Sequence, residues 1–328
     1  MTRAVCILSV VWIGWASAGA GGAEVRLTTQ TTVRFAEPRE GVEALTRRDE
    51  YLRQMSPFDR QVRLKTDRNV SEPELLAFLS QHVLAWNAEE IEKLRPLLEE
   101  LGRKLTAWKL PLPPVVLLVK TDGQEEGGAA YCRGAAIVLP QRMITIGAPT
   151  LNRILPHELF HVLSSHSPRL RESLYQIIGF RSCNEVTLPG ALAARKITNP
   201  DAPRNNHFIS VQQDGRAQEL MPVLFSKTDR YDAARGGTLF EYLEFKLMLL
   251  ENDQGVRRAA LVDGKPVLYD PTGVSGFGEQ IGGNTRYTIH PEEILADNFV
   301  FLIEGRIDLP TPRVIEAMGR VLQAAAEK

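Results

Sequence analysis

The residues best suited to catalysis form one short segment, His157-Glu158-Leu159-Phe160-His161. In a helix, residues four positions apart lie on one face, so both imidazoles can reach the same metal ion. Glu158 can then lie beside the metal without binding it, where a carboxylate can take a proton from metal-activated water. This spacing of histidines and glutamate therefore predicts a metal site that carries out hydrolysis.

A buried helix over about residues 150–165 is predicted to carry this segment. The helix is expected to be buried because it is rich in apolar residues: Ile154, Leu155, Leu159, Phe160, Val162 and Leu163. Buried histidines and a buried carboxylate need polar partners, and a metal ion supplies one. The alternative, in which His157 and His161 are surface residues, fits this pattern poorly. Pro156 would interrupt a helix here, so the helix is expected either to begin near Leu155 or to be kinked at Pro156.

A zinc ion bound by two histidines needs a third protein ligand. Glu293 and Asp297 lie one turn apart on a predicted helix that follows His290. One carboxylate can bind the metal while the second accepts the N–H of a ligand histidine. Glu185 is nearer in sequence and is the alternative ligand, but it has no such partner. His166 does not have the spacing of a third histidine ligand and is expected at a helix end.

With these two motifs the chain resembles the gluzincin metallopeptidases, which combine H-E-x-x-H with a glutamate helix of the form E-x-x-[SA]-D. The resemblance implies one catalytic zinc ion, bound by His157, His161 and Glu293. It also implies that Glu158 is the general base and that Asp297 supports a ligand histidine. The implied fold is a zincin-like core, in which an active-site helix and a glutamate helix pack with a mixed sheet.

In such a site, the substrate oxygen that develops negative charge needs a hydrogen-bond donor. Tyr287 and His290 lie just before the glutamate helix and are the candidates for this catalytic role, with Arg286 and His207 as alternatives. Tyrosine and histidine before a helix also serve structural roles, so the assignment is open. The resemblance further implies an edge strand that pairs with a peptide substrate. Residues 135–139 are a candidate for it, although they can equally form an interior strand.

The hydropathy pattern predicts an α+β fold that positions these residues. Strands are expected over residues 25–35, 115–120, 135–139 and 143–146. Helices are expected over residues 72–84, 88–108, 150–165, 168–179, 291–304 and 311–327. The first two helices follow Ser71 and Asn87, each with a glutamate three residues later, which is the pattern of an N-terminal cap.

A β-rich insertion at about residues 205–270 is expected to separate His161 from Glu293 by more residues than is usual in gluzincins. It contains the pairs Asp214-Gly215 and Asp263-Gly264, typical of tight hairpins, and a strand-like run over 240–250. Two domains are predicted. They are an N-terminal strand and arm over residues 24–70 and a zincin-like metallopeptidase domain over residues 71–328.

Residues 1–23 have the features of a secretory signal peptide. Arg3 precedes a short apolar run, and Ala16-Ser17-Ala18 is a possible cleavage site. The apolar run is shorter than the roughly 20 residues of a spanning helix, so a membrane anchor is the weaker alternative. Export to a periplasmic or extracellular compartment is therefore predicted. Cys6 leaves with the signal, and Cys132 and Cys183 can either pair as a disulfide or remain separate thiols.

The amino-acid composition limits the classes of molecule that this protein is expected to bind. The 328 residues carry 39 Lys and Arg against 40 Asp and Glu, a formal net charge of −1. This balance gives no bulk attraction to nucleic acid, and no later segment is apolar enough to span a membrane. We therefore predict a secreted zinc metallopeptidase that hydrolyses a peptide or protein substrate. The alternative is a catalytically silent secreted protein of the same fold, used for binding or envelope assembly.

Overall fold

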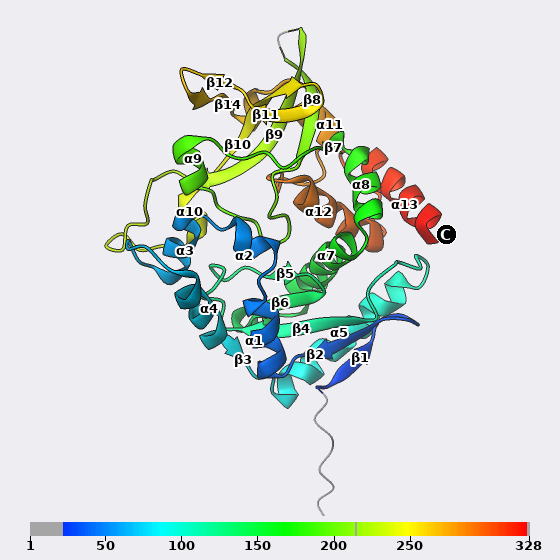
Figure 1. The fold of residues 1–328 in the computed structure, drawn as a ribbon. Helices are drawn as coiled ribbons and strands as arrows, with labels where there is room; N and C mark the ends of the chain where they lie inside the picture. Colours follow the sequence, from blue (N-terminus) through cyan, green and yellow to red (C-terminus); the bar gives the residue numbers. More distant parts are fainter. Residues whose placement is uncertain (1–21, 214, 327–328) are drawn as a thin grey trace, which may run out of the picture.

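A mixed sheet of six strands forms the lower part of the molecule in Figure 1. The computed structural model describes residues 22–213 and 215–326, so nearly all of the predicted signal peptide lies outside the described residues. The strands of this sheet are β1 (Glu24–Arg26), β2 (Thr32–Phe35), β3 (Val83–Leu84), β4 (Val115–Thr121), β5 (Tyr131–Arg133) and β6 (Ala136–Pro140). Strands β2, β4 and β6 are parallel, whereas β1, β3 and β5 are antiparallel to their neighbours.

The strand order β1-β2-β4-β6-β5 corrects one sequence prediction and decides between two alternatives for another segment. The single strand expected over residues 25–35 is a hairpin, because the backbone N–H groups of Leu27 and Thr28 both donate to the carbonyl of Thr31. The segment 135–139 does form a strand, but β6 lies between β4 and β5 and is interior. The edge of the sheet on this side is β5.

The part of the predicted N-terminal arm that follows β2 contains three helices. These are α1 (Pro38–Thr46), α2 (Glu50–Gln54) and α3 (Pro57–Leu64). Proline occupies the first turn of α1 and α3, where its missing N–H costs nothing. The next two helices, α4 (Glu72–Gln81) and α5 (Ala88–Leu105), begin at the predicted caps. Helix α4 ends earlier than predicted because Val83 and Leu84 pair with β4 as strand β3.

The helix that carries the histidine motif is α7 (Ala148–His166). Gly147 precedes it with a φ of 112°, a conformation that glycine adopts easily, so the helix begins two residues earlier than predicted. Pro156 therefore lies inside α7, which excludes the alternative in which the helix begins near Leu155. The strand expected over residues 143–146 is also wrong, since these residues belong to helix α6 (Gln141–Ile146).

A second sheet, entirely antiparallel, lies at the opposite end of the molecule (Figure 1). Its strands are β7 (Phe180–Ser182), β8 (His207–Gln213), β9 (Arg216–Ser226), β10 (Leu243–Asp253), β11 (Val256–Ala259) and β14 (Leu268–Tyr269). The run predicted as a strand from residue 240 begins as helix α10 (Leu239–Tyr242) before β10 starts. Residues 205–270 are thus rich in β-structure, as predicted.

Both predicted hairpins of this region are flanked by paired strands. Strands β12 (Leu261–Val262) and β13 (Lys265–Pro266) pair across Asp263 and Gly264, which both have positive φ. Strands β8 and β9 pair up to Gln213 and Arg216, while Asp214 lies outside the described residues. The tight Asp-Gly turn is the reason that such short segments can pair.

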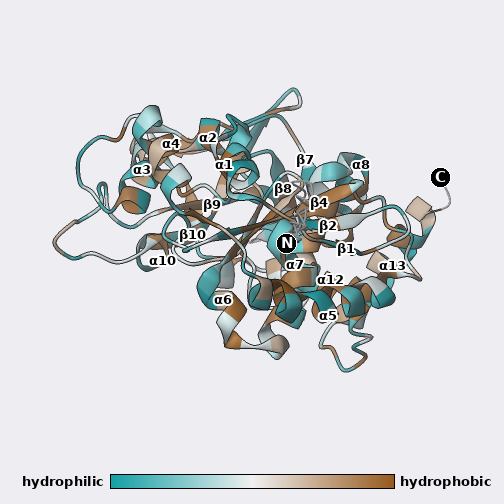
Figure 2. Ribbon diagram, turned by 90° about the horizontal axis from the view of Figure 1, so that it is seen from below, coloured by the Kyte–Doolittle hydropathy of each residue, from teal (hydrophilic) through white to brown (hydrophobic). Residues whose placement is uncertain are grey.

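Helices α8 (Pro168–Ile177) and α12 (Pro291–Ile303) pack against α7 between the two sheets, and α13 (Pro312–Ala326) packs against α8 and α12 (Figure 1). Shorter helices complete the chain: α9 (Gly190–Ala194), η1 (Pro271–Gly273) and α11 (Phe277–Ile281). The largest hydrophobic core includes residues of α5, α7, α12 and both sheets, and Figure 2 shows apolar residues on α7 and α12. This packing places α7 directly against α12.

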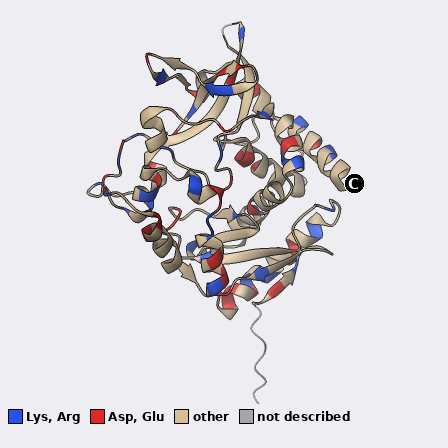
Figure 3. Cartoon of the chain, in the orientation of Figure 1, with Lys and Arg blue, Asp and Glu red and all other residues tan. Residues whose placement is uncertain are grey.

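Charged residues are distributed over the outer helices and loops with both signs interspersed (Figure 3). This agrees with the formal net charge of −1. Among the described residues, no helix combines the length and the apolar character needed to cross a bilayer. The two described cysteines, Cys132 and Cys183, are both free thiols, so the disulfide alternative is not realised in this structure.

Candidate metal centre

Helices α7 and α12 bring together the three residues expected to bind a metal. The Nε2 atom of His157 lies 3.2 Å from Glu293 Oε2, and Nε2 of His161 lies 3.6 Å from the same oxygen. One ligand atom from each residue lies within 4.8 Å of the other two. In a tetrahedral zinc site with bonds of about 2.0–2.1 Å, ligand atoms are about 3.3 Å apart. The three side chains are therefore spaced as metal ligands.

Each histidine is oriented by a carboxylate on its other ring nitrogen. His157 donates from Nδ1 to Asp297 at 3.1 Å, and Asp297 also accepts the hydroxyl of Thr285. His161 donates from Nδ1 to Glu292 at 3.0 Å. With Nδ1 used in this way, the Nε2 atoms of both rings are left for the metal. The structure thus brings Asp297 to the position expected of it.

Glu292 is a further residue of this site, and the sequence pattern did not predict its contact with His161. Its second oxygen accepts hydrogen bonds from the hydroxyls of Ser164, at 2.7 Å, and Tyr175. The carboxylate is almost fully buried, and it connects α12 with α7 and α8. In the sequence, the pair Glu292-Glu293 has the form of an ordinary acidic first turn, which gives no hint that the two carboxylates act on different ligands.

Asn199 is a second residue without a sequence signal. Its side-chain amide donates to Glu293 Oε1 at 2.6 Å. Since Oε2 faces the two histidines, Asn199 fixes the carboxylate so that one oxygen points to the metal position. Asn199 belongs to the irregular segment between α9 and β8, whose contact with α12 only the folded chain creates.

Glu158 lies in the wall of the same cavity as the three ligand residues, a space of about 580 Å³. Its side chain is 4 % exposed. Burial raises the pKa of this carboxyl, although the neighbouring His161 and His157 oppose the rise. Its backbone carbonyl and its Oε2 lie 3.1 and 3.5 Å from the thiol of Cys132 on β5. A carboxylate in this position can accept a proton from a water molecule in the cavity.

The charges of the ligand residues depend on one another. Burial alone would lower the pKa of His157, but hydrogen bonds to Asp297 and Glu293 raise it to about 9. Burial would likewise raise the pKa of Glu293, but His161 and His157 hold it well below its usual range. The site therefore contains an ionised carboxylate between two imidazoles, an arrangement in which a cation can replace the protons of the histidines.

The candidate hydrogen-bond donors lie in different places. Tyr287 lines the cavity of the metal centre, and its ring stacks on His157 with centroids 6.4 Å apart. His290 is the N-cap of α12, where its Nδ1 accepts the backbone N–H of Glu292 at 3.1 Å. Its ring lines a neighbouring cavity rather than the metal cavity. His207 lines that second cavity as well.

Glu185, the alternative third ligand, accepts the backbone N–H of Asn205 and is not part of the ligand group. His166 is the last residue of α7, as expected. Comparison with known proteins adds no assignment: no family model matches the chain, and neither a curated protein nor a solved structure matches it significantly.

Proposed function

We propose that this protein is a zinc-dependent hydrolase of the gluzincin type, most specifically a metallopeptidase that is exported through its N-terminal signal. One observation carries the proposal. Helices α7 and α12 present two histidine Nε2 atoms and one carboxylate oxygen at ligand spacing. Glu158 lies in the wall of the same cavity. In this view α7, α12 and the mixed sheet form a zincin-like core.

Each residue of the site has a separate role in the proposed hydrolysis. A zinc ion held by His157, His161 and Glu293 would supply Lewis acidity, which polarises the substrate carbonyl and makes a water molecule more acidic. Glu158 accepts the proton of the attacking water and then delivers it to the departing amine. Tyr287 donates a hydrogen bond to the oxygen on which negative charge develops, because its ring borders the same cavity. Partial burial and the nearby carboxylate of Glu293 raise the pKa of Tyr287, so its hydroxyl is protonated and can donate, although the side chain is 41 % exposed.

A peptide is the substrate class that fits the surroundings of the site. The cavity is lined by Ala129 and Ala130, which directly precede the edge strand β5, and the thiol of Cys132 on β5 contacts Glu158 in the cavity wall. The backbone N–H of Cys132 donates to Asp201 at 2.7 Å in the free protein. When a peptide pairs with this edge, one of its carbonyl oxygens accepts the N–H of Cys132 and displaces the Asp201 carboxylate.

Metal analysis of purified protein tests the assignment of ligands and base. The wild type and Glu158→Gln are expected to contain one zinc per chain, whereas Glu293→Ala loses the metal. Glu158→Gln should bind zinc and lack turnover, because only the base is removed. If Glu293→Ala retains a full zinc equivalent, Glu293 is not the third ligand.

Digestion of a peptide library separates the enzyme from the catalytically silent alternative. We expect cleavage that a chelator abolishes and that added zinc restores. Glu158→Gln serves as the matched control, since it retains the zinc ligands. A zinc-loaded wild-type protein that cleaves no peptide would favour a binding or assembly role for the same fold.

A further inference from the structure

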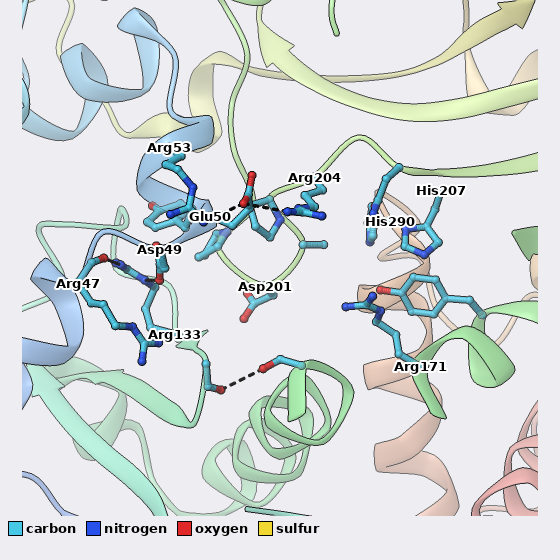
Figure 4. Close-up of a pocket in the computed structure, with 18 residues that line it drawn as sticks. Arg47, Asp49, Glu50, Arg53, Arg133, Arg171, Asp201, Arg204, His207 and His290 are labelled. Carbon is cyan, nitrogen blue, oxygen red and sulfur yellow. Dashed lines mark hydrogen bonds and ion pairs between the residues drawn. The ribbon is translucent and has the colours of Figure 1, made fainter. Parts of the chain in front are cut away.

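A second cavity, of about 420 Å³, adjoins the metal centre and is lined by arginines (Figure 4). The arginines come from the α1–α2 region, β5, α8 and the segment before β8: Arg47, Arg53, Arg133, Arg171 and Arg204. The carboxylates in the same wall are Asp49, Glu50 and Asp201. Guanidinium groups thus outnumber carboxylates, although the whole chain has a formal net charge of −1.

The ion pairs of this cavity do not neutralise its arginines. Arg133 is buried, and each of its three guanidinium nitrogens already donates a hydrogen bond. The acceptors are Asp49 at 2.8 Å and the carbonyls of Leu45 and Arg47. Arg53 and Arg204 share a single partner, because both contact the same oxygen of Glu50, at 3.0 and 3.1 Å.

The other two arginines add to the excess of positive charge. Arg171 contacts Glu172 at 3.2 Å, and that carboxylate is shared with His207 at 3.1 Å. Within the described part of the chain, the guanidinium of Arg47 has no ion pair or hydrogen bond. The cavity can therefore bind an anion. Guanidinium groups bind carboxylates through two parallel hydrogen bonds in a fixed geometry.

The arginine-lined cavity and the metal cavity share a wall. Asp201 lines both of them. On β5, successive side chains point to opposite sides. Cys132 contacts Glu158 of the metal cavity, and the next residue, Arg133, lines the arginine cavity. On the other side, Tyr175 lines the arginine cavity while its hydroxyl binds Glu292, the partner of His161.

Figure 4 shows how the arginines surround the space. Arg47 and Arg133 lie on one side of the view, and Arg171 lies on the other, next to His207 and His290. Asp201 lies between these two groups. A carboxylate placed in this space lies between Arg47 on one side and Arg171 on the other, in a cavity that shares the Asp201 wall with the metal cavity.

We infer that this cavity is a carboxylate-binding subsite, so that the substrate is a peptide with an acidic group next to the bond that is cleaved. The inference rests on the proposed hydrolytic centre. The carboxylate comes either from the C-terminus of the peptide or from an aspartate or glutamate side chain. Both place the same group among the arginines, and the experiment distinguishes them.

The test uses pools of hexapeptides that carry an uncharged fluorophore and whose randomised positions exclude aspartate and glutamate. One pool has a C-terminal amide, a second has a free C-terminal carboxylate, and a third has an amide with one glutamate at each position in turn. Binding to zinc-loaded Glu158→Gln protein is measured by fluorescence anisotropy. We expect at least one carboxylate pool to bind fivefold or more tightly than the amide pool.

The same measurement is made after Arg47→Gln and Arg204→Gln are added together. Both arginines are at the protein surface, and Glu50 keeps its contact with Arg53. The binding preference for the carboxylate pool should fall to about one, whereas Arg320→Gln on α13, which lines neither cavity, should leave it intact. If the double variant loses the preference for the second pool, the subsite binds a C-terminal carboxylate. If it loses the preference for the third pool, the subsite binds an acidic side chain.

Two outcomes overturn the inference: equal binding of all pools, or a carboxylate preference that survives in the double variant. Cleavage of the pools by wild-type protein is scored separately. If no pool is cleaved but the preference and its loss are seen, the proposed hydrolase function fails and the carboxylate subsite stands. If all pools are cleaved and bound equally, the hydrolase stands and the subsite fails.

Discussion

At the scale of single residues, the metal centre depends on two adjacent carboxylates with different tasks. Successive residues of a helix are about 100° apart around its axis, so Glu292 and Glu293 leave α12 in different directions. Glu293 meets the Nε2 atoms of both histidines, whereas Glu292 accepts the Nδ1 proton of His161. Asp297, one turn later, accepts a hydrogen bond from Nδ1 of His157.

Replacing Glu292 should weaken the metal site without removing a ligand. In Glu292→Gln, His161 loses the charged acceptor that orients its ring, and zinc affinity is expected to fall roughly 10-fold or more. Competition with a fluorescent zinc chelator measures the change. Glu304→Gln, at the end of the same helix, is the control and should bind zinc like the wild type. Equal affinities for Glu292→Gln and wild type would contradict the role assigned to Glu292.

A second prediction at this scale concerns Glu125, which is fully buried in the loop after β4. Burial raises the pKa of its carboxyl from 4.5 to about 7. The folded protein therefore holds this proton more tightly than the unfolded chain. The resulting stabilisation is complete below pH 4.5 and is lost as the pH rises through about 7.

Glu125→Gln cannot ionise and removes this dependence. Relative to the wild type, its free energy of unfolding should increase by about 3 kcal/mol between pH 4.5 and pH 8.5. Urea unfolding at the two pH values measures the difference. Glu316→Gln, an exposed position on α13, should show no such change with pH. A pH-independent difference for Glu125→Gln would mean that Glu125 is ionised in the folded protein.

At the scale of elements, the site depends on the packing of α7 against α12. Phe160 of α7 and Phe299 of α12 are both buried, with ring centroids 5.6 Å apart. Phe160 directly precedes His161, so this contact sets the distance between the two ligand-bearing helices. Pro156 does not prevent α7 from forming, because the helix gains more from packing along its whole length than the roughly 3 kcal/mol that an internal proline costs.

Phe299→Ala tests this packing. Loss of a buried phenylalanine and the cavity left behind should reduce the free energy of unfolding by roughly 3–5 kcal/mol. Phe240→Ala is the matched control, since Phe240 is 47 % exposed and should cost much less. Urea unfolding compares the two variants. Similar small losses in both would show that the aromatic contact does not stabilise the helix pair.

At the scale of the whole molecule, the metal ligands come from parts of the chain that the second sheet separates. His157 and His161 precede that sheet in the sequence, and Glu293 follows it. The unfolded chain does not hold these residues together, so zinc should bind the folded state preferentially. Binding at a zinc concentration 1,000 times Kd would add about 4 kcal/mol to stability.

Thermal unfolding with and without metal measures this coupling. We expect Tm of the wild type to rise by several degrees when chelator is replaced by excess zinc. Glu293→Ala should show a much smaller rise, because one of its three ligands is missing. An identical rise in both proteins would indicate that zinc stabilises the fold at another place.

The sequence alone predicted the histidine helix, the glutamate helix and the three residues that the structure brings within ligand distance of one another, because each motif depends on local spacing along one helix. It was wrong where a local pattern competes with sheet pairing or chain reversal. Residues 143–146 form a helix rather than a strand, and residues 25–35 form a hairpin rather than one strand. The interior position of β6 also required the strand order, which no local pattern contains.

Only the tertiary structure decided which residues support the ligands. Asn199 and Glu292 reach Glu293 and His161 through contacts between segments that are far apart in the sequence. The arginine cavity likewise joins side chains from α2, β5, α8 and the segment before β8. A repeating helix period determines what one helix presents on one face, whereas the neighbours of that face are set by how the whole chain buries its apolar surface.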